Sequence, residues 1–449
     1  MHFISDLHLH SKYSRAVSKN MELEQMVKWA HKKGIDLITV ADWTHPLWFK
    51  EMRSKLTEAQ EGMYILNESL NDDDPLKYKE LRFILSVEIS SIYSQGGQTR
   101  RIHNLVFASS FEVAEKINAQ LLKRGANLSA DGRPIIGLSA KDLLTLILEI
   151  DEKSFLIPCH IWTPWFSVFG SKSGFNSLKE CFGELADKIF AVETGLSSDP
   201  FMNWQIEELD NRSIVSFSDS HSLIKLGREA TVFDFNKDLN EVSFLDIKKA
   251  LMRQNGGGKI AYTIEFYPEE GKYHYTGHRN CQVVYGPKDS LENGTICPVC
   301  KRPLTVGVVE RVNELASRQE FKMTEKENNR SLKWIIDPKG NHPPFVSLVP
   351  LIEIVAESLN VLVGSQRVME LYDKLCYNFG SEFNVLLKEN IDDIEKFAGE
   401  RVAEAIQKVR KRDISISPGY DGVFGKVKIW DQDKVEGDDN SMSQTAFDF

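Results

Sequence analysis

The chain has 449 residues, 42% of them hydrophobic and 27% charged, which is the composition of an ordinary folded protein long enough for two or three domains. No apolar run approaches the ~20 residues of a membrane span, and this excludes an integral membrane protein. The net charge of −10 does not exclude nucleic acid as a partner, because phosphate binding depends on local basic patches.

The first 240 residues alternate β-rich runs with helical stretches, which predicts a parallel α/β barrel or sheet. The expected strands are Phe3–Leu7, Leu37–Ala41, Phe83–Val87, Ile102–Phe107, Phe155–Pro158, Ile189–Val192 and Ile214–Phe217. Helices are expected over Glu22–Lys33 and Ala140–Ile150, the second begun by a Ser139–Asp142 capping pair. The polar stretch Ser54–Lys79 is predicted to be an insertion outside the barrel. Because the first strand begins at once, we expect no signal peptide and a cytoplasmic, nucleoid-associated protein.

Two changes of pattern divide the rest of the chain. Asn255–Gly258 predicts a linker or hairpin, and short aromatic strands at Tyr262–Tyr267 and Tyr273–Tyr275 follow it. From about Val308 the pattern becomes helical, with apolar residues at helical spacing over Phe345–Asn360 and two helix–turn–helix stretches after it. We therefore expect domains at 1–240, 241–310 and 311–435, then a flexible acidic tail at 436–449.

Metal-binding residue types gather at or near the carboxyl ends of the expected strands. Alternation along the first strand places His8 and His10 on one face, as two ligands of one ion require. In barrels and open α/β sheets this edge is where active sites assemble. A lone histidine after a strand is usually an ordinary core residue, but six of the eleven histidines occupy such positions, which favours a metal centre. The candidate ligands are His8, His10, Asp42, His45, Glu88, His103, His160, Asp219 and His221.

These residues resemble the motifs of the PHP (polymerase and histidinol phosphatase) family. Asp6-Leu-His-Leu-His10 is similar to the first motif and Gly34–Asp42 to the second. The remaining motifs are matched in order by Glu88, His103, His160 and Asp219-Ser-His221. The resemblance covers about residues 1–240. It implies a distorted (β/α)7 barrel that holds two to three divalent ions, which are zinc, manganese or magnesium.

The resemblance also implies how the ligands are shared. A first ion is assigned to His8, His10, Glu88 and Asp219, and a second, bridged by Glu88, to His103 and His160. A third ion would use His221 with either Asp42 or His45, and the choice stays open, because Trp43 stands where the family's second motif has a histidine. An early histidine of some members is replaced by the stretch Ser11–Arg15. Two close ions suit phosphoester hydrolysis, with Glu88, Asp219 and His160 as the catalytic group.

The cysteines predict a second metal site. Cys159, Cys181 and Cys376 stand alone, whereas three others cluster, which in a cytosolic protein favours metal over disulfide. His278-Arg-Asn-Cys281 and Cys297-Pro-Val-Cys300 form two knuckles whose spacing suits one tetrahedral structural zinc. His274 is a competing ligand.

The C-terminal part contains a candidate DNA-binding region. Glu389–Ile406 resembles a helix-hairpin-helix motif with its turn at Gly399, and hairpin amides bind phosphates without reading sequence. A basic cluster follows the motif, although a plain helical hairpin with a solvated charged end remains an alternative. The residues expected to bind DNA are Lys172, Gly399, Lys408, Arg410, Lys411, Arg412 and Tyr420.

With these three parts in order, the chain resembles the endonuclease Q family along nearly its whole length. Trp162–Gly174, Pro418–Gly425 and Cys297–Gly307 are similar to segments of that family. The resemblance implies cleavage of DNA 5′ to uracil, hypoxanthine, xanthine or an abasic site. The aromatic residues of 162–169 and Tyr420 are candidates for the walls of a pocket that takes an unstacked base.

Two alternatives from other classes are weighed against this function. A small-molecule phosphatase of the histidinol-phosphate type would have no use for the zinc module and the helical tail. A non-catalytic DNA-binding accessory protein is disfavoured by the near-complete set of metal ligands.

The extreme C-terminus, Ser443–Phe449, resembles the short peptides that dock in sliding-clamp pockets. Gln444 would bind at the pocket rim, and Phe447 and Phe449 would fill its apolar part. Phe447 stands where such peptides usually have Leu or Met, and a frayed tail is the alternative.

Overall fold

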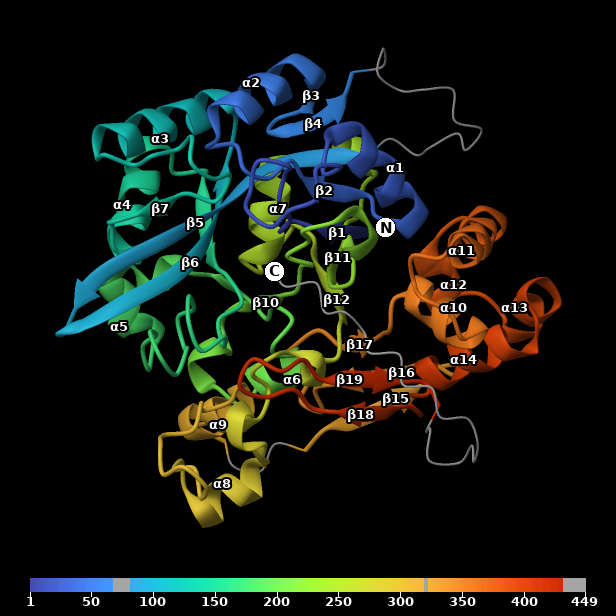
Figure 1. Cartoon of the computed structure of the whole chain (residues 1–449). Helices are drawn as coiled ribbons and strands as arrows, with labels where there is room; N and C mark the ends of the chain where they lie inside the picture. The colour runs from blue at the N-terminus through green and yellow to red at the C-terminus, as the bar shows by residue number, and fades with distance from the viewer. Residues whose placement is uncertain (68–80, 319–321, 431–449) are drawn as a thin grey trace.

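The structure is a computed structural model that describes residues 1–67, 81–318 and 322–430. It is a mixed α/β protein with a large central sheet, helices around it, a compact helical cluster on one side and a small segment that projects at one end (Figure 1). No helix in these three ranges has the length and apolar character needed to cross a membrane.

The central sheet takes strands from most of the described chain. These are β1 (His2–Asp6), β2 (Leu37–Thr39), β3 (Leu56–Gln60), β4 (Met63–Leu66), β5 (Arg82–Gln95), β6 (Gln98–Ala108), β7 (Ile135–Ile136), β8 (Phe155–Pro158), β11 (Ala230–Asp234), β12 (Lys259–Glu265), β15 (Thr324–Glu327), β16 (Lys333–Ile336) and β17 (Phe345–Ser347). The main path is β15-β16-β17-β12-β11-β1-β2-β5-β4-β3, and β6, β7 and β8 join it through β5 and β6. β9 (Ala191–Glu193) and β10 (Ser213–Val215) form a separate parallel pair.

The expected alternation of strand and helix holds at first and is then interrupted. β1, β2 and β5 are parallel neighbours with helices between them. β5 and β6, however, form one long antiparallel hairpin, which projects from the body (Figure 1). Its turn uses Gly96 and Gly97, whose φ angles of +61° and +74° are the left-handed conformation that a two-residue hairpin turn needs. The expected strands Phe83–Val87 and Ile102–Phe107 are therefore parts of a single arm.

The helices of the first half surround the sheet. They are α1 (Leu23–Lys33), α2 (Pro46–Lys55), α3 (Phe111–Lys123), α4 (Ala140–Ile150), α5 (Leu178–Phe182), α6 (Pro200–Asn203) and α7 (Phe244–Leu251). α1 and α4 match the expected helices to within one residue. The expected cap of α4 is confirmed, because the Asp142 backbone N donates to Ser139 Oγ at 3.0 Å.

Four expectations need correction. The stretch Ser54–Lys79 is not wholly an insertion, because β3 and β4 extend the central sheet; residues 68–80 lie outside the described part. The aromatic strand β12 does not start a separate unit but pairs antiparallel with β11. The beginning of Phe345–Asn360 is strand β17, because these buried residues pair with β12. β15 and β16 likewise lie in the region expected to be helical, so the sheet crosses the predicted boundaries at 241 and 311.

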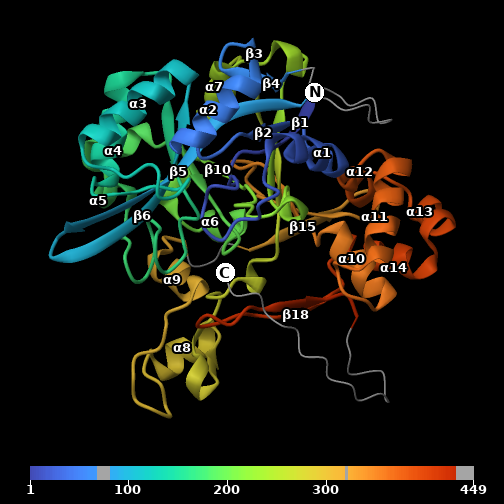
Figure 2. The same ribbon diagram turned by 45° about the horizontal axis from the view of Figure 1, so that its top comes forward.

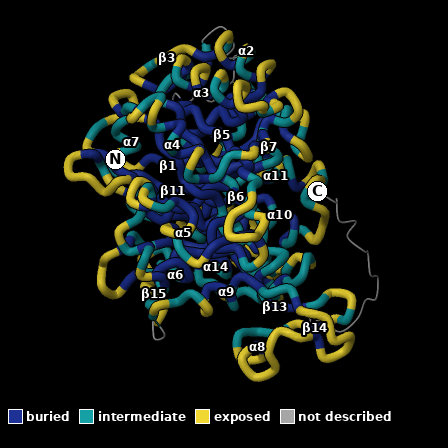
Figure 3. Tube along the Cα trace, turned by 90° about the vertical axis from the view of Figure 1, so that its left-hand side faces the viewer, coloured by how far each residue is buried: buried dark blue, intermediate teal, exposed yellow. Residues whose placement is uncertain are grey.

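The remaining elements form two groups. α10 (Leu351–Leu359), α11 (Gln366–Phe379), α12 (Glu382–Leu387), α13 (Ile391–Ala398) and α14 (Glu400–Arg410) make the helical cluster beside α1. β13 (Thr276–His278), β14 (Val283–Tyr285), α8 (Pro287–Asn293) and α9 (Val308–Leu315) belong to the projecting segment, and the hairpin of β18 (Ser415–Ser417) and β19 (Lys426–Lys428) runs between the two groups (Figure 2). Figure 3 shows that the segment around α8 and β14 is largely exposed while the sheet is buried.

Candidate metal centre

The structure brings most of the predicted ligands together inside the protein. His8 and His10 follow β1 and are fully buried, while Glu88 and His103 come from the two strands of the β5–β6 hairpin. Ligand atoms within 4.8 Å of one another form groups that could hold an ion. In the described chain, the groups in this cluster are His8, His10 and Asp219; Glu88, His103 and His160; and His8, Glu88 and Cys159.

Glu88 lies between the first two groups. Its Oε1 contacts His103 Nδ1 and is 3.2 Å from His160 Nε2, while its Oε2 is 3.6 Å from His10 Nε2. Burial alone would raise the pKa of Glu88, but His103 and Arg133 beside it hold that pKa well below its usual value. Glu88 is therefore a charged carboxylate with one oxygen directed to each group of histidines, as a bridging ligand requires.

Glu193, which the sequence reasoning missed, orients two of these histidines. One of its oxygens is 2.8 Å from His8 Nδ1, and the other accepts a hydrogen bond from the His160 backbone N at 2.8 Å. A carboxylate on one ring nitrogen fixes the other nitrogen as the ligand atom. His8 Nε2 is buried and has no hydrogen-bond partner among the described residues, so it fits a metal ligand. Its position could have indicated this role, because Glu193 ends β9 and most of the candidate ligands also follow strands.

The backbone at the site is strained. Asp42, His160 and Asp219 have φ angles of +46°, +28° and +46°, which non-glycine residues seldom adopt and which cluster at functional sites. Gly195 supports the second of these residues, because a Cβ at that position would lie 2.2 Å from His160 Cβ.

Neither Asp42 nor His45 belongs to a group of residues that could hold an ion in the described chain. Asp42 Oδ2 accepts hydrogen bonds from Ser11 N at 2.6 Å, Ser11 Oγ at 2.7 Å and Ser14 Oγ at 2.8 Å. Its Oδ1 is 3.3 Å from His10 Nδ1, so Asp42 orients His10 much as Glu193 orients His8. Ser11 and Ser14, in the stretch Ser11–Arg15, thus bind this carboxylate.

His45 and His221 also lie outside the groups that could hold an ion in the described chain. The His45 ring stacks on Tyr13, with centroids 4.3 Å apart. His221 Nδ1 is 2.9 Å from the Asp219 backbone O, and its ring packs 4.7 Å from that of His10. Neither histidine therefore belongs to a group that could hold a third ion in the described chain.

The segment Trp162–Gly174 covers one side of this cluster. His103 N donates to Phe166 O at 3.0 Å, and the two rings lie 4.6 Å apart. Trp165 reaches toward the projecting segment, where its ring is 5.4 Å from that of Tyr273. Buried Arg311 fixes the segment, because its guanidinium donates to the backbone O of Phe169 at 3.0 Å. An aromatic face thus lies next to the candidate metal ligands.

The candidate metal site holds protons that a bound ion would displace. Burial would lower the pKa of His8, but Glu193 and Asp219 raise it to about 10. In the same way, Asp219 and Asp42 raise the pKa of His10 to about 9 despite burial.

We therefore expect binding of divalent ions to strengthen as the pH rises from 6 to 9, because protonated histidines cannot be ligands and protons compete at low pH. Calorimetry at pH 7.5 in two buffers of different protonation enthalpy should detect release of about two protons per chain. Binding that does not vary over this pH range would contradict the protonated metal-free state.

The four predicted zinc ligands also come together. The ligand atoms of His278, Cys281, Cys297 and Cys300 lie within 4.8 Å of one another, at the turn after β13 and the turn before Arg302. Such a set suits a tetrahedral structural zinc. The competing His274 lies outside this group, and its burial lowers its pKa to about 4.

Replacing Cys300 by serine should remove about one equivalent of zinc per chain and increase proteolysis of residues 270–305, because structural zinc supplies folding free energy. Elemental analysis and limited proteolysis measure the two effects. Cys181→Ala, a buried thiol elsewhere, is the control and should keep the zinc. Equal metal contents in the two variants would mean that the clustered cysteines are ordinary thiols.

The predicted DNA-binding residues differ in their accessibility. Lys172 and Gly399 are exposed, and Gly399 has a φ of +90° between α13 and α14. Arg410 is 1% exposed, and its guanidinium donates to the backbone O of Val385, Leu386 and Glu389. Its prediction as a DNA contact is therefore wrong, because it binds the carbonyl end of α12.

The other members of that set are partly buried. Lys408 Nζ pairs with Asp413 at 2.7 Å, and the Arg412 guanidinium lies over the Tyr267 ring. Lys411 is half-buried, and the backbone of Tyr420 forms isolated β-bridges with Tyr275 and Val423. Gln444, Phe447 and Phe449 lie outside the described residues.

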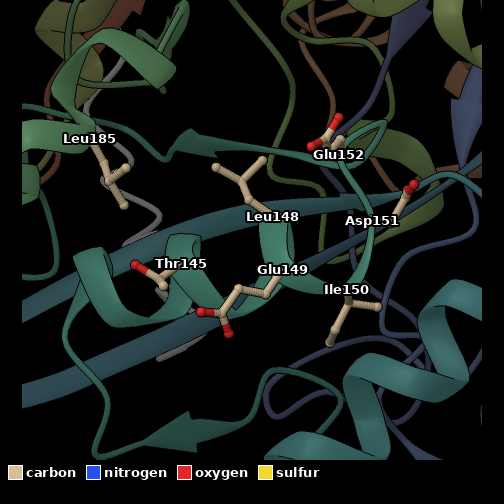
Figure 4. Close-up of a pocket in the computed structure, with 7 residues that line it drawn as sticks. All are labelled: Thr145, Leu148, Glu149, Ile150, Asp151, Glu152 and Leu185. Atoms are coloured by element: carbon tan, nitrogen blue, oxygen red, sulfur yellow. The ribbon is translucent and has the colours of Figure 1, made fainter.

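A shallow pocket of 450 Å³ elsewhere on the surface does not coincide with the metal centre. It is lined by the end of α4, the loop after it and Leu185 (Figure 4). That loop precedes β8, whereas His160 follows β8, so the pocket lies at the opposite end of the strand. Its charged lining residues are Glu149, Asp151 and Glu152, which would repel a phosphate.

The chain is similar in sequence to a family model and to two curated proteins. Residues 350–413, the helical cluster, match a family model described as the MJ0043 C-terminal domain. The chain is 30% identical over 309 residues to the uncharacterized protein MJ0043 of Methanocaldococcus jannaschii, a match to 67% of this chain but only 36% of that protein. It is 28% identical over 439 residues to the uncharacterized protein YqxK of Bacillus subtilis, covering 94% of this chain and 98% of that one.

Two solved structures are similar over nearly the whole chain. One is the lesion-specific endonuclease PfuEndoQ from Pyrococcus furiosus, with 30% identity, a TM-score of 0.78 and 95% coverage of both chains. The other is endonuclease Q in complex with a 27-mer duplex substrate with an abasic lesion at the active site, with 30% identity, a TM-score of 0.79 and coverage of 97% and 98%. The fold and the histidine–carboxylate cluster define a mixed α/β protein with a candidate metal centre. The chain belongs to the endonuclease Q family.

Proposed function

We propose that this protein is a metal-dependent DNA repair endonuclease that hydrolyses the phosphodiester 5′ to a deaminated base or an abasic site. The observation that carries the proposal is the position of Glu88, whose two oxygens face separate groups of histidines. The family supports it, since one relative is described as a lesion-specific endonuclease and another binds a duplex with an abasic lesion at its active site.

The residues at the site have distinct roles in this proposal. His8, His10 and Asp219 would hold one ion, and His103 and His160 a second that shares Glu88. Two such ions, when bound, lower the pKa of a water molecule and offset the negative charge of the phosphodiester. The protein itself fixes the ligands, because Glu193 and Asp42 each bind the far nitrogen of a ligand histidine.

The surroundings of the site suit a base that has left the helix. A base is read outside the stack by aromatic faces and hydrogen bonds, and this costs least at a damaged pair. Phe166 lies beside His103, and Trp165 precedes it in a segment held by Arg311. We assign this aromatic segment to the lesion pocket, with Lys172 on its exposed side as a phosphate contact.

The rest of the molecule would position the DNA. We infer that the first 240 residues form a PHP barrel, that the four-ligand group holds a structural zinc, and that α13 and α14 form a helix-hairpin-helix with Gly399 at its exposed turn. We propose further that the tail docks in a sliding clamp through Gln444, Phe447 and Phe449, which would raise the local concentration of the enzyme on DNA.

The test uses end-labelled duplexes with one deoxyuridine, deoxyinosine, deoxyxanthosine or abasic site, beside an undamaged duplex. We expect a nick on the 5′ side of the lesion, with 3′-hydroxyl and 5′-phosphate ends, which a chelator abolishes and added metal restores. Release of free base or a nick only on the 3′ side would contradict the proposal. Release of phosphate from small monoesters alone would identify a phosphatase, and binding of DNA without cleavage would identify an accessory protein.

A further inference from the structure

The loop before β7 closes the corner of the site where a third ion was expected. Gly132 N donates to Tyr13 O at 3.1 Å, and its carbonyl accepts from Thr44 Oγ1 at 3.1 Å. A Cβ at Gly132 would come within 2.5 Å of Asp42 Oδ2, so the backbone lies directly against that carboxylate. Asp42 Oδ2, already bonded to Ser11 and Ser14, is thereby enclosed.

The next residue of the loop places a positive charge inside the cluster. Arg133 Nη1 is 3.3 Å from Glu88 Oε2, the oxygen that also faces His10. Burial would lower the pKa of Arg133, but Glu88, Asp219 and Asp131 raise it above its usual value, so the guanidinium stays charged. The side chain keeps 23% of its surface exposed, so a substrate can reach it.

We propose that Arg133 binds a non-bridging oxygen of the scissile phosphodiester and supplies the positive charge that a third ion would otherwise provide. The inference rests on the proposed endonuclease function. A guanidinium has five N–H donors in a planar fork, so Arg133 can remain paired with Glu88 and still donate to a phosphate oxygen.

The chemistry explains why a fixed cation is useful here. Hydrolysis adds the hydroxyl of water to phosphorus and breaks the P–O3′ bond, and the proton of that water ends on the O3′ atom. Negative charge on the non-bridging oxygens must be stabilised along this path, and donors that are already oriented do so without rearrangement. Arg133 gives up no proton in the process, because its guanidinium stays protonated.

The test compares Arg133→Ala with Arg124→Ala, which removes an exposed arginine after α3. For metal-loaded Arg133→Ala we expect kcat on lesion DNA to fall about a hundredfold or more, as when one oriented donor is removed. The metal content and the Kd for lesion DNA should stay within about threefold of the wild type, and binding of inorganic phosphate should weaken. Added guanidinium should restore cleavage by Arg133→Ala in a saturable manner, and Arg124→Ala should behave as the wild type.

Each other outcome overturns the proposal. Cleavage by Arg133→Ala at near wild-type rate would show that Arg133 does not act on the substrate. Loss of metal from that variant, without rescue by guanidinium, would make Arg133 a positioning residue for Glu88. If wild-type protein cleaves no DNA, the proposed function fails, but phosphate binding by the two variants still decides whether Arg133 is an anion ligand.

Discussion

Glu88→Gln is expected to reduce cleavage of lesion DNA by about a thousandfold or more, while the fold and most of the DNA affinity remain. The substitution keeps the volume of the buried side chain but removes the charge shared by both histidine groups. Metal content should also fall, because His103 and His160 lose the carboxylate that lies between them. Nicking assays, elemental analysis and circular dichroism measure the three quantities.

The matched control for this experiment is Glu149→Gln. Glu149 is a carboxylate of the surface pocket at α4 (Figure 4). From the order of the elements, this pocket lies at the end of β8 away from the candidate metal ligands. Glu149→Gln should leave cleavage and metal content unchanged. A Glu88→Gln protein that cleaves as fast as this control would remove Glu88 from the active site.

Gly195→Ala should be the most damaging of the glycine substitutions near the site. The new Cβ would lie 2.2 Å from His160 Cβ and 2.7 Å from His160 Cα, so His160 must move. The φ of +56° at this position adds backbone strain to this contact. We therefore expect a loss of about 2–4 kcal/mol in the free energy of unfolding. Cleavage should fall at least about a hundredfold, because an ångström of misplacement at a ligand is enough for such a loss.

Gly125→Ala separates backbone strain from the displacement of His160. Gly125 has a φ of +83°, but a Cβ there meets nothing within 4 Å. Its alanine variant should lose only about 1 kcal/mol and keep its activity. Denaturant titration and the nicking assay compare the two variants, and equal losses in both would mean that the contact with His160 is unimportant.

The candidate ligands could be predicted from the sequence because most of them follow strands, and strand ends meet at one edge of a sheet. Glu193 also ends a strand but was overlooked, and Arg133 could not be found in this way. Glu193 ends the ordinary run Ala191-Val-Glu193, which matches no ligand spacing, and Arg133 lies in a loop whose path depends on Tyr13 and Thr44. The role of Asp42 likewise depends on hydroxyl groups that the loop before α1 brings to it.

Other departures come from contacts between distant parts of the chain. β17 is a strand because it pairs with β12, although its residues also fit the helical pattern of the stretch that follows. The basic end of α14 suggested a surface for phosphate, but periodicity does not tell which face a neighbouring helix covers. In the folded chain α12 packs beside α14, and the buried Arg410 guanidinium donates to backbone O atoms of α12. The turn of the β5–β6 hairpin, by contrast, could have been predicted from Gly96-Gly97. The expected alternation of strand and helix led instead to the prediction of two separate strands.

The parallel pairing of β12 with β17 has a consequence for how the chain folds. Thr263 pairs with Phe345, and all four candidate zinc ligands lie in the chain between them. The entropy lost on closing a loop grows with its length, and a segment that folds by itself shortens the effective loop. Zinc binding involves residues close in sequence, so we expect the knuckles to form early and to bring the two strands nearer before they pair. Refolding in the presence of a chelator should therefore be slower at the step that completes the central sheet, even though the zinc ligands contribute no strand to it.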